Sequence, residues 1–143
     1  DLISKVVLLF ETKPEILKKY QSRYDHILVD EYQDVNASQY RLVSFLARPH
    51  GRLAVVGDDA QSIYAFRGSD FRNFLNFDKD WPDATVIKLE ENYRSSGNIV
   101  AGASELIKNN SLQKPKSLWT QKETGRDMYA QYPRDFLLQR HLP

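Results

Sequence analysis

Short runs of aliphatic residues alternate along this chain with longer segments in which apolar residues recur at helical spacing. The runs predict three strands, at 27–29, 53–56 and 85–89, because short, nearly continuous β-branched and aliphatic stretches suit parallel strands covered on both faces. Each run is followed at once by acidic residues. The segments between the runs predict helices, so the strands and helices alternate. This alternation favours an α/β fold with a parallel sheet and right-handed crossovers.

The helices are predicted from capping signals and apolar stripes. Asn36, with Gln39 three residues later, makes a capping pair after the first strand. Pro14 marks the start of the second of two helices expected ahead of that strand. Ser95 or Ser96 caps the helix after the third strand. The stripes expected to face the core are Leu2, Val6 and Leu9; Ile16, Leu17 and Tyr20; Tyr40, Val43 and Leu46; Phe71, Phe74 and Leu75; and Ile99, Val100, Ala103, Leu106 and Ile107.

Composition narrows the class of protein. With 143 residues, 41% of them hydrophobic and 27% charged, the chain is expected to be one soluble globular domain or a piece of a larger protein. It has no cysteine, which excludes disulfides and cysteine-bound metals and agrees with a reducing, cytoplasmic location. No apolar run approaches the roughly 18 residues of a membrane span, so no membrane partner is expected. The start at Asp1 lacks both a methionine and a signal-peptide pattern, which indicates a cut point.

The net charge of +1 hides an uneven distribution. Residues 108–143 carry seven lysines and arginines against three acidic residues, and the rest of the chain is net acidic. A basic segment of this kind fits contacts with phosphates and fits a solvated tail equally well. Charge alone therefore does not establish nucleic-acid binding.

The first acidic strand end is the most informative. Asp30 and Glu31 directly follow the apolar run 27–29. Nucleotide-hydrolysing folds present a magnesium anchor and a water-orienting base in this way, as adjacent carboxylates at the carboxyl edge of a sheet. The alternative is a solvated acidic turn, which any highly charged chain can contain.

The second strand end leads into residues 57–68, which combine a glycine turn with an amide, two aromatic rings and an arginine. Gln61 can hydrogen-bond a phosphate or its attacking water without adding charge. Tyr64 and Phe66 can present rings on which unpaired bases stack. The alternative is that both rings belong to a core beneath a loop.

At the third strand end, Tyr93 and Arg94 lie side by side at an expected helix start. The arginine can offer a bidentate fork to a terminal phosphate, and the tyrosine face suits a purine. A capped helix preceded by a surface arginine explains the same residues.

In combination, the three segments resemble the UvrD/Rep family of superfamily 1 DNA helicases. Residues 30–36, DEYQDVN, are similar to the family's Walker B motif, residues 56–64, VGDDAQSIY, to its third motif, and residues 89–95, LEENYRS, to its fourth. The resemblance extends over about residues 1–120. It implies a parallel sheet of the RecA-like P-loop NTPase class, ATP and Mg²⁺ as ligands, and single-stranded and duplex DNA as partners.

The resemblance also implies roles for individual residues. Asp30 holds Mg²⁺ through water, and Glu31 orients or deprotonates the water that attacks the γ-phosphate. Gln61 senses that phosphate, while Tyr93 packs on the adenine and Arg94 contacts the γ-phosphate. The remaining roles are DNA stacking by Tyr64 and Phe66, and coupling of DNA occupancy to Glu31 by Arg67.

The chain departs from the family pattern in several places. Phe66 stands where the family usually has tryptophan, and Glu91 replaces the more common glutamine; from about Arg126 onward the resemblance ends. The phosphate-binding loop, Gly-x-x-x-x-Gly-Lys-Ser/Thr, does not occur in the chain. We therefore expect a fragment: residues 1–110 as the C-terminal portion of the first motor domain, and residues 111–143 as the hinge and the start of the second. The P-loop segment and the second motor domain become expected partners.

Three hypotheses about the function follow. The first is that the parent protein is an ATP-dependent helicase, with 3′ to 5′ polarity by resemblance, acting in repair, replication or recombination, and that this piece alone is inactive. The second is a non-catalytic module that binds single-stranded nucleic acid. The third is a non-functional remnant with an exposed, aggregation-prone sheet edge.

Overall fold

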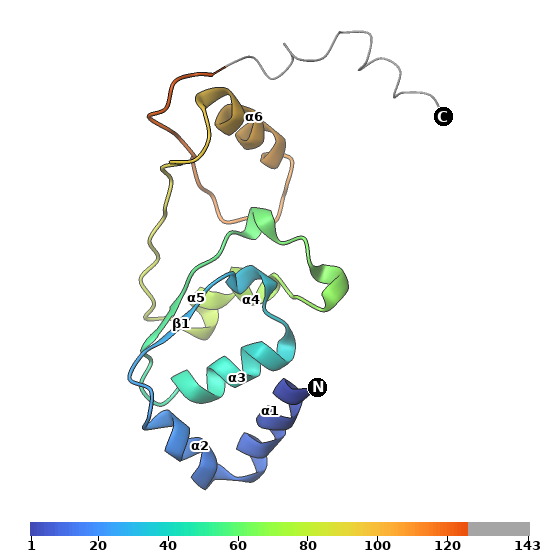
Figure 1. Ribbon diagram of the computed structural model, residues 1–143, viewed down its shortest axis with the longest axis vertical. Coiled ribbons are helices and arrows are strands. Elements are labelled where there is room, and N and C mark those ends of the chain that lie inside the picture. Colours follow the sequence, from blue (N-terminus) through green and yellow to red (C-terminus); the bar gives the residue numbers. More distant parts are fainter. Residues whose placement is uncertain (126–143) are drawn as a thin grey trace, which may run out of the picture. The chain divides into compact units, whose positions relative to one another are not determined.

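A computed structural model describes residues 1–125 of the chain. The chain divides into two compact units, Asp1–Thr85 and Val86–Pro143, which we describe separately (Figure 1). The expected second domain at 111–143 extends past residue 125, so its later part lies outside the described residues.

The first two predicted strands form and pair in parallel. β1 spans Ile27–Val29 and β2 spans Leu53–Val55. Beyond the strands, the Val56 N–H donates to the Val29 carbonyl over 2.8 Å, and the Tyr32 N–H donates to the Val56 carbonyl over 2.9 Å. The carboxyl ends of the two strands therefore lie side by side, and the acidic segments that follow them start from one edge.

The third predicted strand was wrong. Residues 84–90 have no regular secondary structure, and Ile87 and Leu89 are 77% and 78% exposed. A strand forms only against a neighbour that takes its backbone hydrogen bonds, and β1 and β2 are the only strands paired within residues 1–125. The pair itself is covered on one face only, because Leu28 in the middle of β1 is 77% exposed. The described part of the chain is thus a mixed α and β structure with a two-stranded parallel sheet.

Helix α3 (Ala37–Ala47) packs against β1 and against the N-terminal helices α1 (Leu2–Thr12) and α2 (Pro14–Gln21), as Figure 1 shows. Its predicted capping pair is confirmed. The Asn36 Oδ1 accepts from the Gln39 N–H over 3.0 Å, and the Gln39 Oε1 accepts from the Asn36 N–H over 2.9 Å. Such a cap satisfies two donors that the first turn otherwise leaves unpaired, so α3 begins at a fixed residue.

The predicted core face of helix α1 was wrong in part, although Val6 is half-buried as expected. Val7 and Phe10 are buried, whereas Leu2 and Leu9 are 80% and 38% exposed. The helix is apolar on most sides, so spacing alone does not select a face. The selection comes from packing: the Phe10 ring meets the Phe45 ring of α3 edge to face, with centroids 6.4 Å apart.

The helix predicted around Phe71 and Phe74 forms as two single turns, α4 (Arg72–Leu75) and α5 (Phe77–Asp80). The second turn ends at Asp80, with Trp81 as its C-cap residue. α4 packs on Tyr32–Asp34, the segment directly after the acidic pair Asp30 and Glu31.

In the second unit, α6 spans Gly97–Ile107 with Ser96 at its N-cap, as predicted. The Ser96 side chain makes no capping hydrogen bond. Val100 is buried, but Ile99 and Leu106 are 48% and 75% exposed, so the predicted apolar face of this helix was wrong in part.

Candidate functional site

The first unit gathers five polar residues at the carboxyl ends of β1 and β2, which we name the strand-end cluster: Asp30, Glu31, Gln33, Asp58 and Gln61. Asp30 and Glu31 follow β1 directly, and both are exposed. Glu31 has φ 50° and ψ 42°, the left-handed conformation, and is the one non-glycine residue with positive φ among residues 1–125. That conformation costs an L-residue on the order of 1 kcal/mol and is concentrated at functional sites.

The residue after Glu31 anchors this strained turn. The Tyr32 side chain is 1% exposed, and its ring meets the Phe77 ring of α5 edge to face, with centroids 5.6 Å apart. Burial, with the negative fields of Tyr40 and Asp80, raises the pKa of Tyr32 to about 12. Because its ring is buried and its N–H is tied to β2, Tyr32 holds the chain in place immediately after the carboxylate.

Gln33 is also 1% exposed, and both ends of its amide are used. The Gln33 Nε2 donates to the Glu31 Oε2 over 2.7 Å, and the Gln33 Oε1 accepts from the Asp58 N–H over 3.0 Å. One side chain thus joins the acidic end of β1 to the loop that follows β2. We assigned no role to Gln33 from the sequence. The usable signal was a neutral amide, able both to donate and to accept, two residues after the acidic end of the first strand.

The loop after β2 presents Gln61. Asp58 caps a short 3-10 helix, Asp59–Gln61, by accepting from the Ala60 N–H over 3.0 Å. The Gln61 Nε2 donates to the Asp58 Oδ2 over 2.8 Å, and the Gln61 side chain is exposed. The amide of Gln61 is therefore held at the same strand edge as Glu31, through Asp58 and Gln33.

Further along this loop, Tyr64, Phe66 and Arg67 form a group that we name the aromatic clasp. Tyr64 and Phe66 are 38% and 78% exposed, so the alternative that these rings fill a core is wrong. The ring centroids lie 6.0 Å apart, and the Arg67 guanidinium carbon lies 5.0 Å from the Tyr64 centroid and 5.4 Å from the Phe66 centroid. An arginine over two aromatic faces is a cation–π arrangement. The Arg67 guanidinium thus lies against these two rings, whereas the Glu31 carboxylate accepts a hydrogen bond from Gln33.

In the second unit, Tyr93 and Arg94 lie on a turn fixed by Asn92, whose Oδ1 accepts from the Arg94 N–H and the Ser95 N–H over 3.0 and 2.7 Å. Tyr93 is 74% exposed, and its hydroxyl donates to the Glu91 Oε2 over 2.6 Å. This hydrogen bond to a carboxylate raises the pKa of Tyr93.

The backbone of this turn is also hydrogen-bonded to Trp119 and Lys122. Trp119 forms an isolated parallel bridge with Glu91: the Trp119 N–H donates to the Glu90 carbonyl over 3.0 Å, and the Asn92 N–H donates to the Trp119 carbonyl over 2.7 Å. Lys122 Nζ donates to the Arg94 carbonyl over 2.8 Å. These contacts fix the backbone of the Tyr93–Arg94 turn and leave both side chains exposed.

The oxygen ligands at the strand ends suit a magnesium ion that keeps most of its waters. Mg²⁺ is typically held by one or two carboxylates together with substrate phosphates, and Asp30 supplies an exposed carboxylate of this kind. Residues 1–125 contain no group of three or more acidic, histidine or cysteine side chains arranged as a metal cage. Nor is any helix in this part of the chain long and apolar enough to cross a bilayer.

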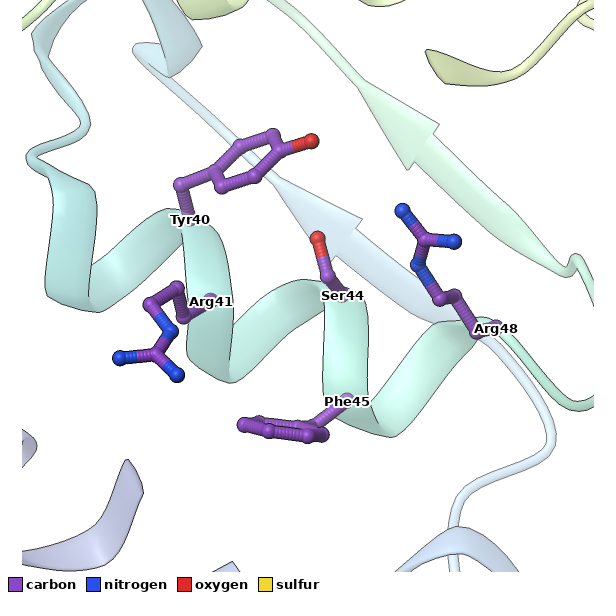
Figure 2. A pocket seen from close by; sticks show the side chains of 5 residues that line it. All are labelled: Tyr40, Arg41, Ser44, Phe45 and Arg48. Carbon is purple, nitrogen blue, oxygen red and sulfur yellow. The ribbon is translucent and has the colours of Figure 1, made fainter. Parts of the chain in front are cut away.

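A pocket of about 220 Å³ lies along α3 (Figure 2). The side chains labelled in Figure 2 come from α3 and from its C-cap residue, Arg48. None of the predicted site residues is among the side chains that line it, which are Tyr40, Arg41, Ser44, Phe45 and Arg48.

Comparison with known proteins identifies the family of this chain. Residues 1–82 match the family described as UvrD/REP helicase N-terminal domain. The chain is 51% identical over 129 residues to the ATP-dependent DNA helicase PcrA of Staphylococcus aureus, covering 90% of this chain and 18% of that protein. It is 53% identical over 125 residues to PcrA of Bacillus subtilis, covering 87% and 17%. The chain thus spans less than a fifth of the length of these relatives. Since the family match covers more than half of the chain, this protein belongs to the UvrD/Rep helicase family.

Proposed function

We propose that this chain contributes the water-activating carboxylate and a DNA-contacting loop to an ATP-dependent DNA helicase, which we call the parent helicase. The parent helicase couples ATP hydrolysis to 3′ to 5′ movement on single-stranded DNA and to duplex separation, in repair, replication or recombination in the cytoplasm. Membership of the UvrD/Rep family and relatives named as ATP-dependent DNA helicases support this function.

The observation that carries the proposal is the strand-end cluster, in which Glu31 and Gln61 are joined through hydrogen bonds at adjacent parallel strand ends. Ligands of open α/β sheets bind outside this edge. Glu31 orients or deprotonates the attacking water, and Gln61 contacts the γ-phosphate with a neutral amide. Asp30 holds Mg²⁺ through its waters, and the ion neutralises phosphate charge when it is bound.

The proposal also assigns nucleotide contacts to two exposed side chains of the second unit. Tyr93 packs on the adenine, and Arg94 offers its guanidinium to the γ-phosphate, where charge develops during transfer. Both are exposed on a turn with a fixed backbone, which leaves them accessible to a ligand.

The aromatic clasp supplies the DNA contact. Tyr64 and Phe66 stack against unpaired bases, an interaction that accepts any sequence because every base has a π-face. Arg67, which lies over both rings, shifts when a base enters and transmits strand occupancy toward Glu31. Exposure of the rings supports this role.

In this proposal residues 1–110 are the C-terminal portion of the first RecA-like motor domain, and residues 111–143 are the hinge and the start of the second motor domain. The P-loop and the strand before it come from another segment of the parent helicase. The chain alone neither hydrolyses ATP nor unwinds DNA, because a P-loop lysine and its backbone N–H groups normally supply much of the triphosphate binding.

Steady-state phosphate release tests this function. The parent helicase should release phosphate with ATP, Mg²⁺ and single-stranded DNA, its Glu31→Gln variant should lose at least about 100-fold in kcat, and the 143-residue chain should stay at background. Phosphate release by the chain alone that disappears with Glu31→Gln would overturn the proposed inactivity. Wild-type rates in the Glu31→Gln parent would overturn the role of Glu31.

A second candidate function, a module that binds single-stranded nucleic acid without catalysis, is favoured by one observation. The rings of the aromatic clasp are exposed and paired with a cation in the chain as it stands. Binding of a labelled oligonucleotide by the 143-residue chain, with no phosphate release, distinguishes this function from hydrolysis.

A further inference from the structure

Among residues 1–125, Gln33 is the one polar or charged residue that is buried. A buried amide with an unused donor or acceptor costs on the order of 1–3 kcal/mol, so its partners fix its orientation. The Nε2 must face the Glu31 carboxylate and the Oε1 must face the Asp58 N–H, because a flipped amide would set oxygen against oxygen and N–H against N–H. Gln33 therefore has one orientation available.

The donor end of Gln33 acts on the carboxylate of Glu31. A hydrogen bond to a carboxylate is stronger than one between neutral groups, and here it spans 2.7 Å. The Glu31 backbone is already confined to the left-handed region, with φ 50°. With its backbone and one of its two oxygens both held, the other oxygen of Glu31 has a restricted set of directions.

The acceptor end of Gln33 is tied to the neighbouring strand. It takes the Asp58 N–H, and Asp58 in turn accepts from Gln61 through its Oδ2 over 2.8 Å. Gly57 closes this contact from the other side, because a Cβ at that position would lie 2.6 Å from the Gln33 Oε1. A shift of the loop that carries Gln61 therefore moves the Asp58 N–H, which donates to the Gln33 Oε1.

We propose that Gln33 is a positioning residue for Glu31: its buried amide aims the carboxylate at the attacking water and keeps that aim in register with the Gln61 loop. The proposal rests on the proposed function, in which Glu31 activates water for ATP hydrolysis. It adds a residue that touches neither nucleotide nor DNA and acts through Glu31 alone.

Three variants of the parent helicase separate this role from simple structural support. Gln33→Glu keeps the acceptor for the Asp58 N–H but replaces the donor by a second carboxylate facing Glu31. Gln33→Met keeps the length of the side chain and removes both hydrogen bonds. Gln39→Glu is the matched control, because the Gln39 Oε1 only accepts from the Asn36 N–H and a carboxylate accepts equally well.

The measurement is DNA-stimulated phosphate release as a function of ATP concentration, expressed as the ratio of variant to wild type. Gln33→Glu should lower kcat about 10- to 100-fold and leave KM within about twofold, since a misaimed catalytic group costs rate rather than substrate binding. Gln33→Met should lower kcat similarly, and Gln39→Glu should match wild type.

The split between kcat and KM identifies the positioning role. A misaimed Glu31 costs rate, whereas a disturbed binding site also costs affinity for ATP. Urea unfolding of each variant, measured beside the kinetics, gives the folded fraction to which kcat is referred. Per folded molecule, kcat of Gln33→Glu and of Gln33→Met should fall while KM stays within about twofold of wild type.

Each outcome decides between the alternatives. A kcat for Gln33→Glu within about twofold of wild type overturns the proposal. A fall in kcat that comes with an equal or larger rise in KM also overturns it, because a misaimed Glu31 costs rate and not substrate binding. A wild-type parent helicase that releases no phosphate refutes the proposed function itself, an outcome separate from active wild type with indifferent Gln33 variants.

Discussion

Gly57 lies so close to Gln33 that a Cβ atom on the glycine would stand 2.6 Å from the Gln33 Oε1. The same atom would lie 2.9 Å from the Phe74 ring. Position 57 therefore requires glycine because no space remains for a Cβ atom, and not because the backbone is left-handed. Strand end, buried amide and aromatic ring are packed without room for a methyl group.

Gly57→Ala should lower the free energy of unfolding by about 1–3 kcal/mol, the usual cost of overpacking a filled interior. The measurement is urea unfolding followed by circular dichroism. Gly97→Ala is the matched control, because its Cβ would meet its nearest neighbour, the Thr124 Cα, at 3.4 Å. Equal effects of the two substitutions would contradict the packing described around Gln33.

A second prediction concerns the left-handed backbone of Glu31. Glu31→Gly and Glu31→Ala both remove the carboxylate and its hydrogen bond from Gln33, but only glycine adopts φ 50° without a steric penalty. The glycine variant should therefore be more stable than the alanine variant by about 1 kcal/mol. Urea unfolding of the two variants measures this difference directly. An alanine variant of equal stability would mean that position 31 stores no strain.

A third prediction concerns the aromatic clasp. Replacing both Tyr64 and Phe66 by alanine should weaken binding of a fluorescently labelled single-stranded oligonucleotide by about 10-fold or more, because stacking contributes about 1–3 kcal/mol per base. Fluorescence anisotropy at several salt concentrations gives the affinity and the phosphate contribution.

The chain offers a matched control for this experiment. Tyr24 is 43% exposed, and the Arg23 guanidinium carbon lies 5.9 Å from its ring centroid, so it is a similar tyrosine–arginine pair outside the loop. Tyr24→Ala should leave the affinity unchanged. If it weakens binding as much as the double substitution does, binding is not localised to the clasp.

A fourth prediction follows from the pKa of Tyr32, which is raised from 10.0 to about 12. A folded-state pKa above the unfolded value favours the protonated form in the folded state. Its stabilising contribution is therefore complete below about pH 10 and is lost as the pH rises toward about 12, by on the order of 2 kcal/mol. Urea unfolding between about pH 9 and pH 11.5 should show wild type losing stability more steeply than Tyr32→Phe. Equal losses of stability in wild type and Tyr32→Phe would contradict a raised pKa of Tyr32.

Local signals in the sequence predicted local structure well. The Asn36–Gln39 cap depends on residues three apart, and both of its hydrogen bonds form. The strands at 27–29 and 53–55 were recognisable because their aliphatic residues leave few other conformations favourable. The 85–89 run has the same composition, yet its backbone has no strand partner within the described residues. A strand's existence depends on its neighbours, which its own composition does not reveal.

In the candidate site, too, the sequence indicated residue types but not the contacts between distant residues. The sequence identified Asp30, Glu31 and Gln61 because their types and order suit phosphate chemistry, and the structure brings Glu31 and Gln61 to one edge of the sheet. It did not identify the amide of Gln33 as the link between them. Burial of a glutamine depends on how a strained turn and a distant glycine pack together, and neither contact has a periodic pattern.

The exposed Leu28 on the uncovered face of β1 has a practical consequence for anyone who handles the isolated chain. Two molecules that meet through this face each remove the Leu28 side chain from water, so a high concentration favours pairs and larger clusters over single molecules. The time for which a preparation stays monodisperse should shorten as its concentration rises. Dilute stocks, checked by light scattering before each titration, therefore suit measurements made on the chain by itself.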